Sequence, residues 1–269
     1  MKHILLVSFY YYPENKPRSF RVFELSKVLV KMGYRVTVVT PTYTGYENIE
    51  VPDGITLQRV GFCKDIKKQT SNRVGTGRSS LKRKIKSIGY YFFPDGKSFL
   101  YLFPLIKCLI FNRKKYDAVI SVSHPYIIHL AVAFSSLFNR GVPGREKRIY
   151  EFGDTLVDCP AIPNSIIHHA MEWIMMRSCR YVVVPVEAAA ISFSRYKDAN
   201  RVKCIPQGFD FTMPIEESVV DNDIPTFIYA GSFHIDARNP KILLEYLSKL
   251  EIDFEFKVYT NLGDANLTS

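Results

Sequence analysis

The sequence predicts an α/β fold with a Rossmann-like parallel sheet and helices on both faces, followed by an incomplete second domain of the same kind. Short apolar runs alternate with segments of helical apolar spacing along most of the chain. The chain has 269 residues and is 47% hydrophobic, so it can bury a sizeable core. A segment rich in Pro, Gly and acidic residues at 206–225 separates the first 205 residues from a last β-α-β pattern.

Each expected element follows from its local pattern. The run from His3 to Phe9 is continuously apolar, which is typical of a strand buried on both faces. Apolar residues between Pro17 and Met32 follow helical spacing, and Gly33 is a suitable stop for that helix. The same reasoning predicts strands at 35–40, 54–61, 117–122, 148–152, 181–184 and 202–205, and helices at 95–113, 127–138, 163–178 and 187–195.

The last part of the chain reads as a separate piece. A buried strand is expected at 226–230, a helix at 239–250 and a further strand at 254–259. One β-α-β unit of about 45 residues is too small to bury both faces of its sheet. We therefore expect an N-terminal domain at 1–205, an interdomain linker at 206–225 and the truncated start of a second domain at 226–269.

The net charge of +10 is distributed unevenly. Nine bases and one acid lie between Lys64 and Lys86, whereas four bases and eleven acids follow residue 205. The basic segment leads into an aromatic-rich run, and bases beside exposed apolar groups favour an anionic membrane surface, here through residues 64–111. A solvated loop followed by an ordinary core helix explains the same pattern. Nucleic acid is not expected as a partner, because no nucleic-acid-binding motif accompanies the charge.

The compartment follows from two absences. No apolar stretch reaches the roughly 20 residues that a membrane-spanning helix needs, so we expect the chain not to cross a membrane. Five widely spaced cysteines argue against a disulfide framework or a zinc ribbon and fit a reducing cytosol.

Candidate site residues follow the predicted strands, because ligands of open parallel sheets bind beyond the carboxyl ends of the strands. After the first strand, Arg18, Ser19 and Arg21 stand in the first turn of a helix, where amides and bases suit an anionic group such as phosphate. A proline-capped surface turn is the simpler alternative. His124 and Asp154 follow two later strands and could meet in one cleft as acid–base or hydrogen-bonding groups. Taken singly, each is commonly a cap or turn residue.

Several short motifs occur in a characteristic order along nearly the whole chain. They cover Ile4 to Pro13, Arg21 to Pro41, Phe93 to Asp95, Tyr116 to Pro125, Phe152 to Asp154, Tyr181 to Pro185, Ile205 to Asp210 and Phe227 to Ser232. Each motif alone is weak. In this order and spacing they resemble glycosyltransferase family 4 of the GT-B fold, particularly its bacterial cell-surface polysaccharide enzymes.

The resemblance implies an acceptor-side N-terminal domain and a C-terminal domain for a nucleotide diphosphate sugar. The sugar would pass to a hydroxyl with retention of the anomeric configuration, without a tightly bound metal or other cofactor. The acceptor would be a saccharide, often lipid-linked, and the protein would be cytoplasmic and peripheral at the inner face of the plasma membrane.

The resemblance also assigns positions. Asp154 stands where the family often keeps a catalytic His or Asp, and Gly208 and Asp210 match its interdomain Gly-x-Asp element. Gly231, and Arg238 and Lys241 after it, lie near where family members contact the donor diphosphate.

Two departures from the family bear on activity. The first loop has Asn15-Lys-Pro-Arg18 where a Gly-Gly pair is common, and the Glu-x7-Glu element and most of the donor domain are not in this sequence. We therefore expect little or no transfer by the free chain. An alternative is a non-catalytic acceptor-binding subunit at the membrane surface that pairs with a separate donor domain. Another enzyme of this fold, such as a sugar-nucleotide epimerase, is disfavoured because it also needs a complete second domain.

Overall fold

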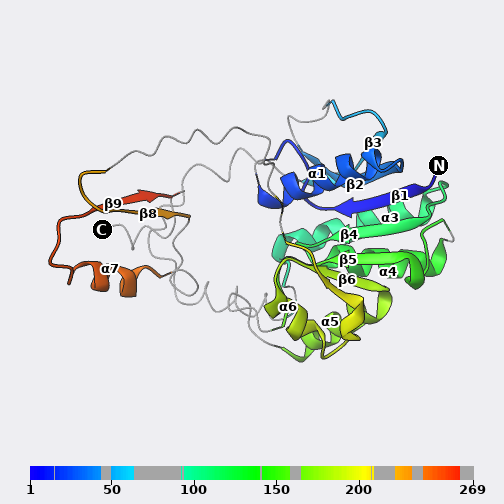
Figure 1. The fold of residues 1–269 in the computed structure, drawn as a ribbon. Helices are drawn as coiled ribbons and strands as arrows, with labels where there is room; N and C mark the ends of the chain where they lie inside the picture. The colour runs from blue at the N-terminus through cyan, green and yellow to red at the C-terminus, as the bar shows by residue number, and fades with distance from the viewer. Residues whose placement is uncertain are drawn as a thin grey trace. The chain divides into compact units, whose positions relative to one another are not determined.

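The computed structural model describes residues 1–14, 16–43, 50–63, 92, 94–139, 141–157, 165–206, 208, 222–231 and 239–260 (Figure 1). These residues belong to two compact units. The first unit contains the described residues up to 206, and the second contains those from 208 onward. The basic segment at 64–86 and most of the predicted linker lie outside the described residues.

The described part of the first unit is built on a seven-stranded parallel sheet. Its strands run in the spatial order β3-β2-β1-β4-β5-β6-β7. The chain order of the strands reverses between β1 and β4, and ligands of open α/β sheets bind at such a switch point. The strands are β1 (His3–Ser8), β2 (Arg35–Tyr43), β3 (Ile55–Cys63), β4 (Ala118–Val122), β5 (Arg148–Glu151), β6 (Tyr181–Val184) and β7 (Val202–Cys204).

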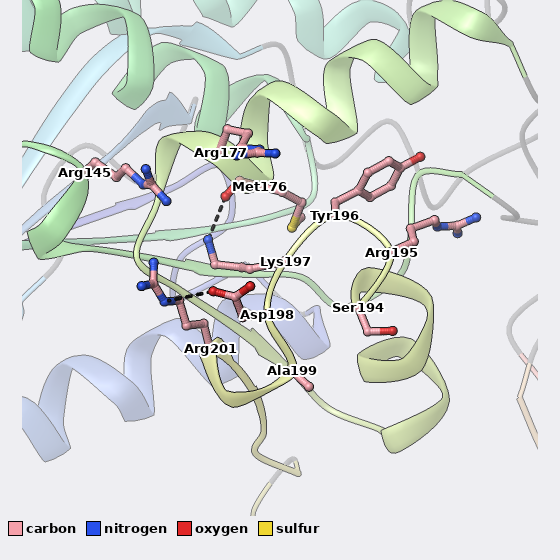
Figure 2. A pocket seen from close by; sticks show the side chains of 10 residues that line it. All are labelled: Arg145, Met176, Arg177, Ser194, Arg195, Tyr196, Lys197, Asp198, Ala199 and Arg201. Atoms are coloured by element: carbon pink, nitrogen blue, oxygen red, sulfur yellow. Dashed lines mark hydrogen bonds and ion pairs between the residues drawn. The ribbon is translucent and has the colours of Figure 1, made fainter.

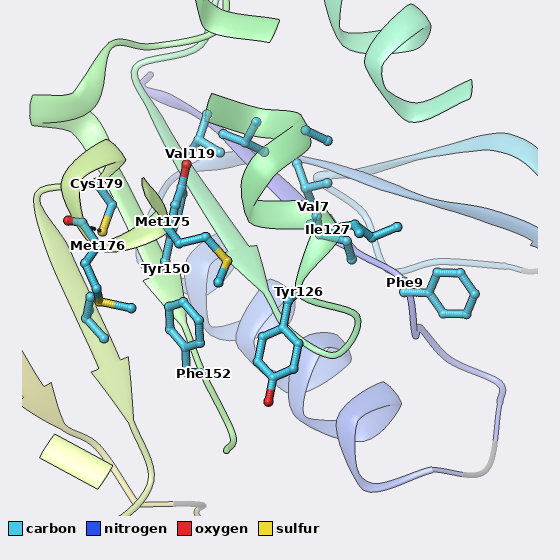
Figure 3. Close-up of a cluster of buried hydrophobic side chains, with 14 of the residues drawn as sticks. Val7, Phe9, Val119, Tyr126, Ile127, Tyr150, Phe152, Met175, Met176 and Cys179 are labelled. Carbon is cyan, nitrogen blue, oxygen red and sulfur yellow. Dashed lines mark hydrogen bonds between the residues drawn. The ribbon is translucent and has the colours of Figure 1, made fainter. Parts of the chain in front are cut away.

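Helices cover both faces of this sheet, as the sequence predicts. Successive strand residues point to opposite faces, so Ile4 and Leu6 pack with Val22 of α1, while Leu5 and Val7 join the larger cluster on the other face. Figure 3 shows part of that larger cluster. The helices are α1 (Pro17–Lys31), α3 (Leu102–Phe111), α4 (Ile127–Phe138), α5 (Ile166–Ser178) and α6 (Glu187–Phe193), with 3-10 turns η2 (Gly96–Tyr101), η3 (Arg145–Lys147) and η4 (Ala199–Arg201).

The described part of the second unit contains two parallel strands, β8 (Thr226–Ala230) and β9 (Glu255–Tyr259), and the helix α7 (Lys241–Leu247). The strand predicted at 226–230 is present, but the prediction that it is buried is wrong. Ile228 is 65% exposed and Phe227 is 39% exposed. Within the described residues of this unit, two strands and one short helix supply too little surface to cover both faces of the sheet.

The described helices include none that is long and apolar enough to span a membrane.

Candidate functional site at the β1–β4 switch point

Three turns meet at the carboxyl edge of the sheet, because β1, β4 and β5 are adjacent parallel strands. Ser8, the last residue of β1, pairs with Val122 of β4, and Val122 pairs with Glu151 of β5. The turns that follow these strands therefore begin at the same level. They carry Arg18, in the first turn of α1, His124 and Asp154.

Arg18 connects the three turns. Its guanidinium donates to Asp154 Oδ2 at 3.0 Å and to the backbone oxygen of Ser123 at 2.5 Å. A side chain at Gly153 would prevent this arrangement, since a Cβ there would overlap the guanidinium of Arg18. Gly153 thus leaves the space in which Arg18 lies against the β5 turn.

His124 and Asp154, which the sequence singles out separately, lie side by side. His124 Nε2 is 3.5 Å from Asp154 Oδ2. The imidazole is also held edge-on against the ring of Tyr126, with 4.4 Å between ring centroids, and the Tyr126 hydroxyl donates to the backbone oxygen of Thr155 at 3.0 Å. The Asp154 side chain is 62% exposed and that of His124 is 33% exposed. A ligand arriving from solvent can therefore reach both groups.

The surroundings of Asp154 favour its charged form. The hydrogen bond from His124 is the largest cause that lowers the pKa of the Asp154 carboxyl below its usual value, and the charge of Arg18 lowers it further. Partial burial acts in the opposite direction but is outweighed. At neutral pH Asp154 is a carboxylate, which can only accept hydrogen bonds.

Asp95 holds the start of the helix that follows His124, and the sequence alone did not assign it a role. Its two carboxylate oxygens accept from the backbone N–H groups of Tyr126 and Ile127, both at 2.8 Å, at the start of α4. Burial raises the pKa of Asp95, while these two amide bonds and the charge of His124 lower it. The only signal in the sequence is the Phe93-Pro-Asp95 motif, which stands about 30 residues before the helix that it caps.

The sequence suggests an anion site at the start of α1, but in the structure both arginines of this site are already paired with carboxylates. Arg18 is paired with Asp154, and Arg21 is paired with Glu151. Ser19 is fully buried. An anion would have to displace a carboxylate from one of the two arginines. Arg21 also donates to the backbone oxygens of Ile205, at 3.3 Å, and Pro206, at 3.4 Å.

The remaining predicted site residues belong to the part of the chain that follows residue 207. Gly208 is exposed, with no atom close to the position of a Cβ. Gly231 has a φ of +150°, which favours glycine, and its N–H donates to the backbone oxygen of Tyr259 at 2.9 Å. Lys241 is exposed, with its Nζ 3.7 Å from Glu245. The other two, Asp210 and Arg238, lie outside the described residues.

The described ranges contain no group of three or more His, Cys, Asp or Glu side chains that could hold a metal ion.

Comparison with known proteins finds the relationship in structure and not in sequence. No protein-family model matches the chain, and no curated protein matches it. Sucrose-phosphate synthase from Thermosynechococcus elongatus has a TM-score of 0.59 at 12% identity, over 96% of this chain and 62% of its own. The lipopolysaccharide outer core galactosyltransferase WaaB has a TM-score of 0.54 at 10% identity, over 95% of this chain and 60% of its own.

A third similar structure is HepE of Anabaena in complex with UDP, with a TM-score of 0.55 at 13% identity. It covers 100% of this chain and 64% of its own. The chain thus spans less than two thirds of the length of these three proteins. With its parallel sheet and helices on both faces, this chain has a Rossmann-like fold of the GT-B type.

Proposed function

We propose that this chain is a glycosyltransferase that moves a sugar from a nucleotide diphosphate to a saccharide or lipid-linked saccharide. The observation that carries the proposal is the Arg18–Asp154–His124 cluster at the switch point of a GT-B sheet. HepE has been solved with UDP-glucose, at a TM-score of 0.50, and starch synthase IV with ADP and acarbose, at 0.55. These ligands support a nucleotide sugar as donor and a saccharide as acceptor. Surface polysaccharide or glycolipid synthesis is the process that we assign.

The cluster suits the acceptor half of the reaction. The Asp154 carboxylate accepts a hydrogen bond from His124 and orients the imidazole, and His124 accepts the hydrogen bond of the acceptor hydroxyl and takes its proton as the new bond forms. Arg18 holds Asp154 in place. The acceptor oxygen bonds to the anomeric carbon while the bond from that carbon to the diphosphate oxygen breaks, and the configuration is retained. We assign Gly231, Arg238 and Lys241 to the donor diphosphate, and Gly208 and Asp210 to the donor side of the site as its interdomain Gly-x-Asp element, with no tightly bound cofactor.

The test is release of nucleoside diphosphate from a panel of UDP-, ADP- and GDP-sugars, with lipid-linked saccharides extracted from bacterial membranes as acceptors. We expect weak release by the chain alone. Asp154→Asn and His124→Ala should each reduce it by about 10²-fold or more, the usual contribution of a positioned acid–base group. The matched controls are Asp53→Asn and His169→Ala, which change exposed residues outside the cluster.

Release that is unchanged in Asp154→Asn and His124→Ala would refute the assigned roles. Release from none of the donors would contradict a transfer activity of this chain by itself. Where transfer is detected, the anomeric configuration of the product, read by NMR coupling constants, tests retention.

We further propose that the protein works as a peripheral protein at the cytoplasmic face of the plasma membrane. Much of the 64–111 stretch predicted to contact lipid lies outside the described residues, but its last part and the neighbouring helix support the proposal. The ends of α3 and α4 are joined, because Asn139 donates to the backbone oxygens of Leu109, at 2.6 Å, and Asn112, at 2.8 Å. Large apolar side chains stand exposed on these helices and the turn before them: Leu100, Phe103, Phe111, Phe134, Leu137 and Phe138.

Positive charge accompanies this apolar surface. Lys107, Arg113, Lys114 and Lys115 are exposed on α3 or directly after it, and the sequence from 96 to 116 contains no acidic residue. Each base near an anionic leaflet contributes about 1 kcal/mol. Apolar side chains that enter the interface add to this attraction.

Sedimentation with vesicles tests the membrane proposal. We expect binding to phosphatidylglycerol vesicles that weakens as salt rises, and little binding to phosphatidylcholine vesicles. Replacing Phe111 and Leu137 by Ser should weaken binding about tenfold or more, whereas Ile191→Ser, a change of an equally exposed residue on α6, should not. Equal binding of all these proteins would refute the surface that we assign.

A further inference from the structure

A second candidate site lies at the amino ends of the strands β5, β6 and β7 in the first unit. A cavity of about 380 Å³ is lined by residues that precede strands, whereas the His124–Asp154 cluster follows strands. Its walls come from η3, which precedes β5, from the end of α5, which precedes β6, and from the connection between α6 and β7. The lining residues, shown in Figure 2, are Arg145, Met176, Arg177, Ser194, Arg195, Tyr196, Lys197, Asp198, Ala199 and Arg201.

The lining of this cavity is strongly basic. Five of its ten residues are arginine or lysine, and Asp198 is the single acid. Asp198 is 3.5 Å from Arg201 Nε, and its side chain is 73% exposed, so it offsets little of the charge. Bases that gather in a concave site raise the local concentration of anions, which bases scattered over a convex surface do not.

Lys197 gives this cavity a buried positive charge. The residue is only 7% exposed, and its ammonium donates to the backbone oxygens of Met176 and Cys179, both at 2.7 Å. No ion pair joins Lys197 to a carboxylate among the described residues. Burial is the largest cause that lowers the pKa of Lys197, and the charges of Arg145 and Arg201 lower it further.

Arg145 and Arg201 both lie close enough to Lys197 to repel its ammonium. In Figure 2 the ammonium of Lys197 and the guanidinium groups of Arg145 and Arg201 gather on one side of the cavity. An anion bound among them would replace this repulsion with attraction. Burial would strengthen that attraction, because water screens charges less well there.

We propose that this cavity binds a phosphate-containing anion, with Arg145, Lys197 and Arg201 as the groups that contact it. A phosphoryl group carries up to two charges and presents several oxygens, which match the fork of N–H donors on a guanidinium. The cavity is larger than one phosphate, so it has room for a diphosphate, a small phosphorylated metabolite or a phospholipid headgroup. The proposal does not rest on the proposed glycosyltransferase activity, because none of these residues belongs to the switch-point cluster.

Thermal unfolding with inorganic phosphate or pyrophosphate, against sodium chloride at equal ionic strength, tests the proposal. A ligand that binds only the folded protein raises its melting temperature in a saturable manner. We expect such a rise, and we expect Arg145→Gln and Arg201→Gln each to weaken binding about tenfold or more. Arg35→Gln removes one exposed charge outside the cavity and serves as the control. Lys197 is left intact, since it also holds the end of α5.

Vesicles distinguish the two sources of a phosphate group. Binding to phosphatidic acid vesicles that exceeds binding to phosphatidylcholine and is lost in Arg145→Gln and Arg201→Gln would identify a lipid headgroup. Saturable binding of soluble phosphate or pyrophosphate, with vesicle binding unaffected by these variants, would identify a soluble ligand. The proposal is overturned if neither phosphate source shows binding that depends on Arg145 and Arg201.

Discussion

A buried imidazole should make the stability of this protein depend on pH. His129 of α4 is fully buried, and its Nδ1 lies 2.6 Å from the Ser121 hydroxyl. Its ring stacks on that of Tyr150, with 4.5 Å between centroids. Burial above all, and then the charges of His124 and Arg18, lower the pKa of His129 to about 3. The folded protein therefore keeps this side chain neutral.

The direction and size of the effect follow from linkage. In the unfolded chain the pKa of a histidine is about 6.5, so this state takes up a proton as the pH falls below that value. The folded state does not take it up until near pH 3. The free energy of unfolding therefore falls by about 1.4 kcal/mol per pH unit below pH 6.5, or about 2 kcal/mol between pH 7.5 and pH 5.

Urea unfolding at pH 7.5 and pH 5.0, followed by circular dichroism, measures this quantity. Other groups also titrate in this range, so the informative value is the difference between wild type and His129→Gln, which keeps a polar partner for Ser121. We expect wild type to lose about 2 kcal/mol more than this variant on acidification. His169→Gln is the matched control, since His169 is exposed, and it should behave like wild type.

The reasoning is refuted if wild type and His129→Gln lose the same stability between the two pH values. It is also refuted if His169→Gln removes as much of the pH dependence as His129→Gln does.

Three further predictions concern the supports of the candidate site and of the fold around it. Gly153→Ala should displace the Arg18 guanidinium and lower glycosyl transfer about tenfold or more, whereas Gly144→Ala, with open space at its Cβ, should leave it unchanged. Asp95→Ala should lower the free energy of unfolding in urea by about 1–2 kcal/mol, because the first backbone amides of α4 lose their hydrogen-bond acceptor. An unchanged midpoint of urea unfolding would contradict this capping role. Glu172→Ala should lower the free energy of unfolding by about 3 kcal/mol in the same measurement, because this buried side chain accepts hydrogen bonds from two backbone amides after β5. A decrease below about 0.5 kcal/mol would contradict this role.

The sequence predicts most elements of the first unit well, because their signals are local. The helix at 127–138 and the strand at 181–184 begin and end where their apolar runs do. The helix expected at 95–113 instead divides into η2 and α3. Pro104 is consistent with this division, since it stands in the first turn of α3, where a missing N–H costs no intrahelical hydrogen bond.

The site was predictable only to the extent that its residues depend on their own neighbours along the chain. His124 and Asp154 each follow a predicted strand, and adjacent parallel strands bring such residues together. Arg18 packs against Gly153, a residue 135 positions away in the sequence, and no local sequence pattern predicts this contact. The strand β8 was predicted, but its exposure was not, because an apolar run does not reveal which other residues cover it.

The two carbonyl contacts of Arg21 have a consequence for the segment that leaves β7. Arg21, near the start of α1, donates to the backbone oxygens of Ile205 and Pro206 and so holds the backbone directly after β7. The backbone that leaves β7 is thus attached to the same helix that supplies Arg18. A change at Arg21 would therefore loosen the backbone at the point where the chain leaves the sheet.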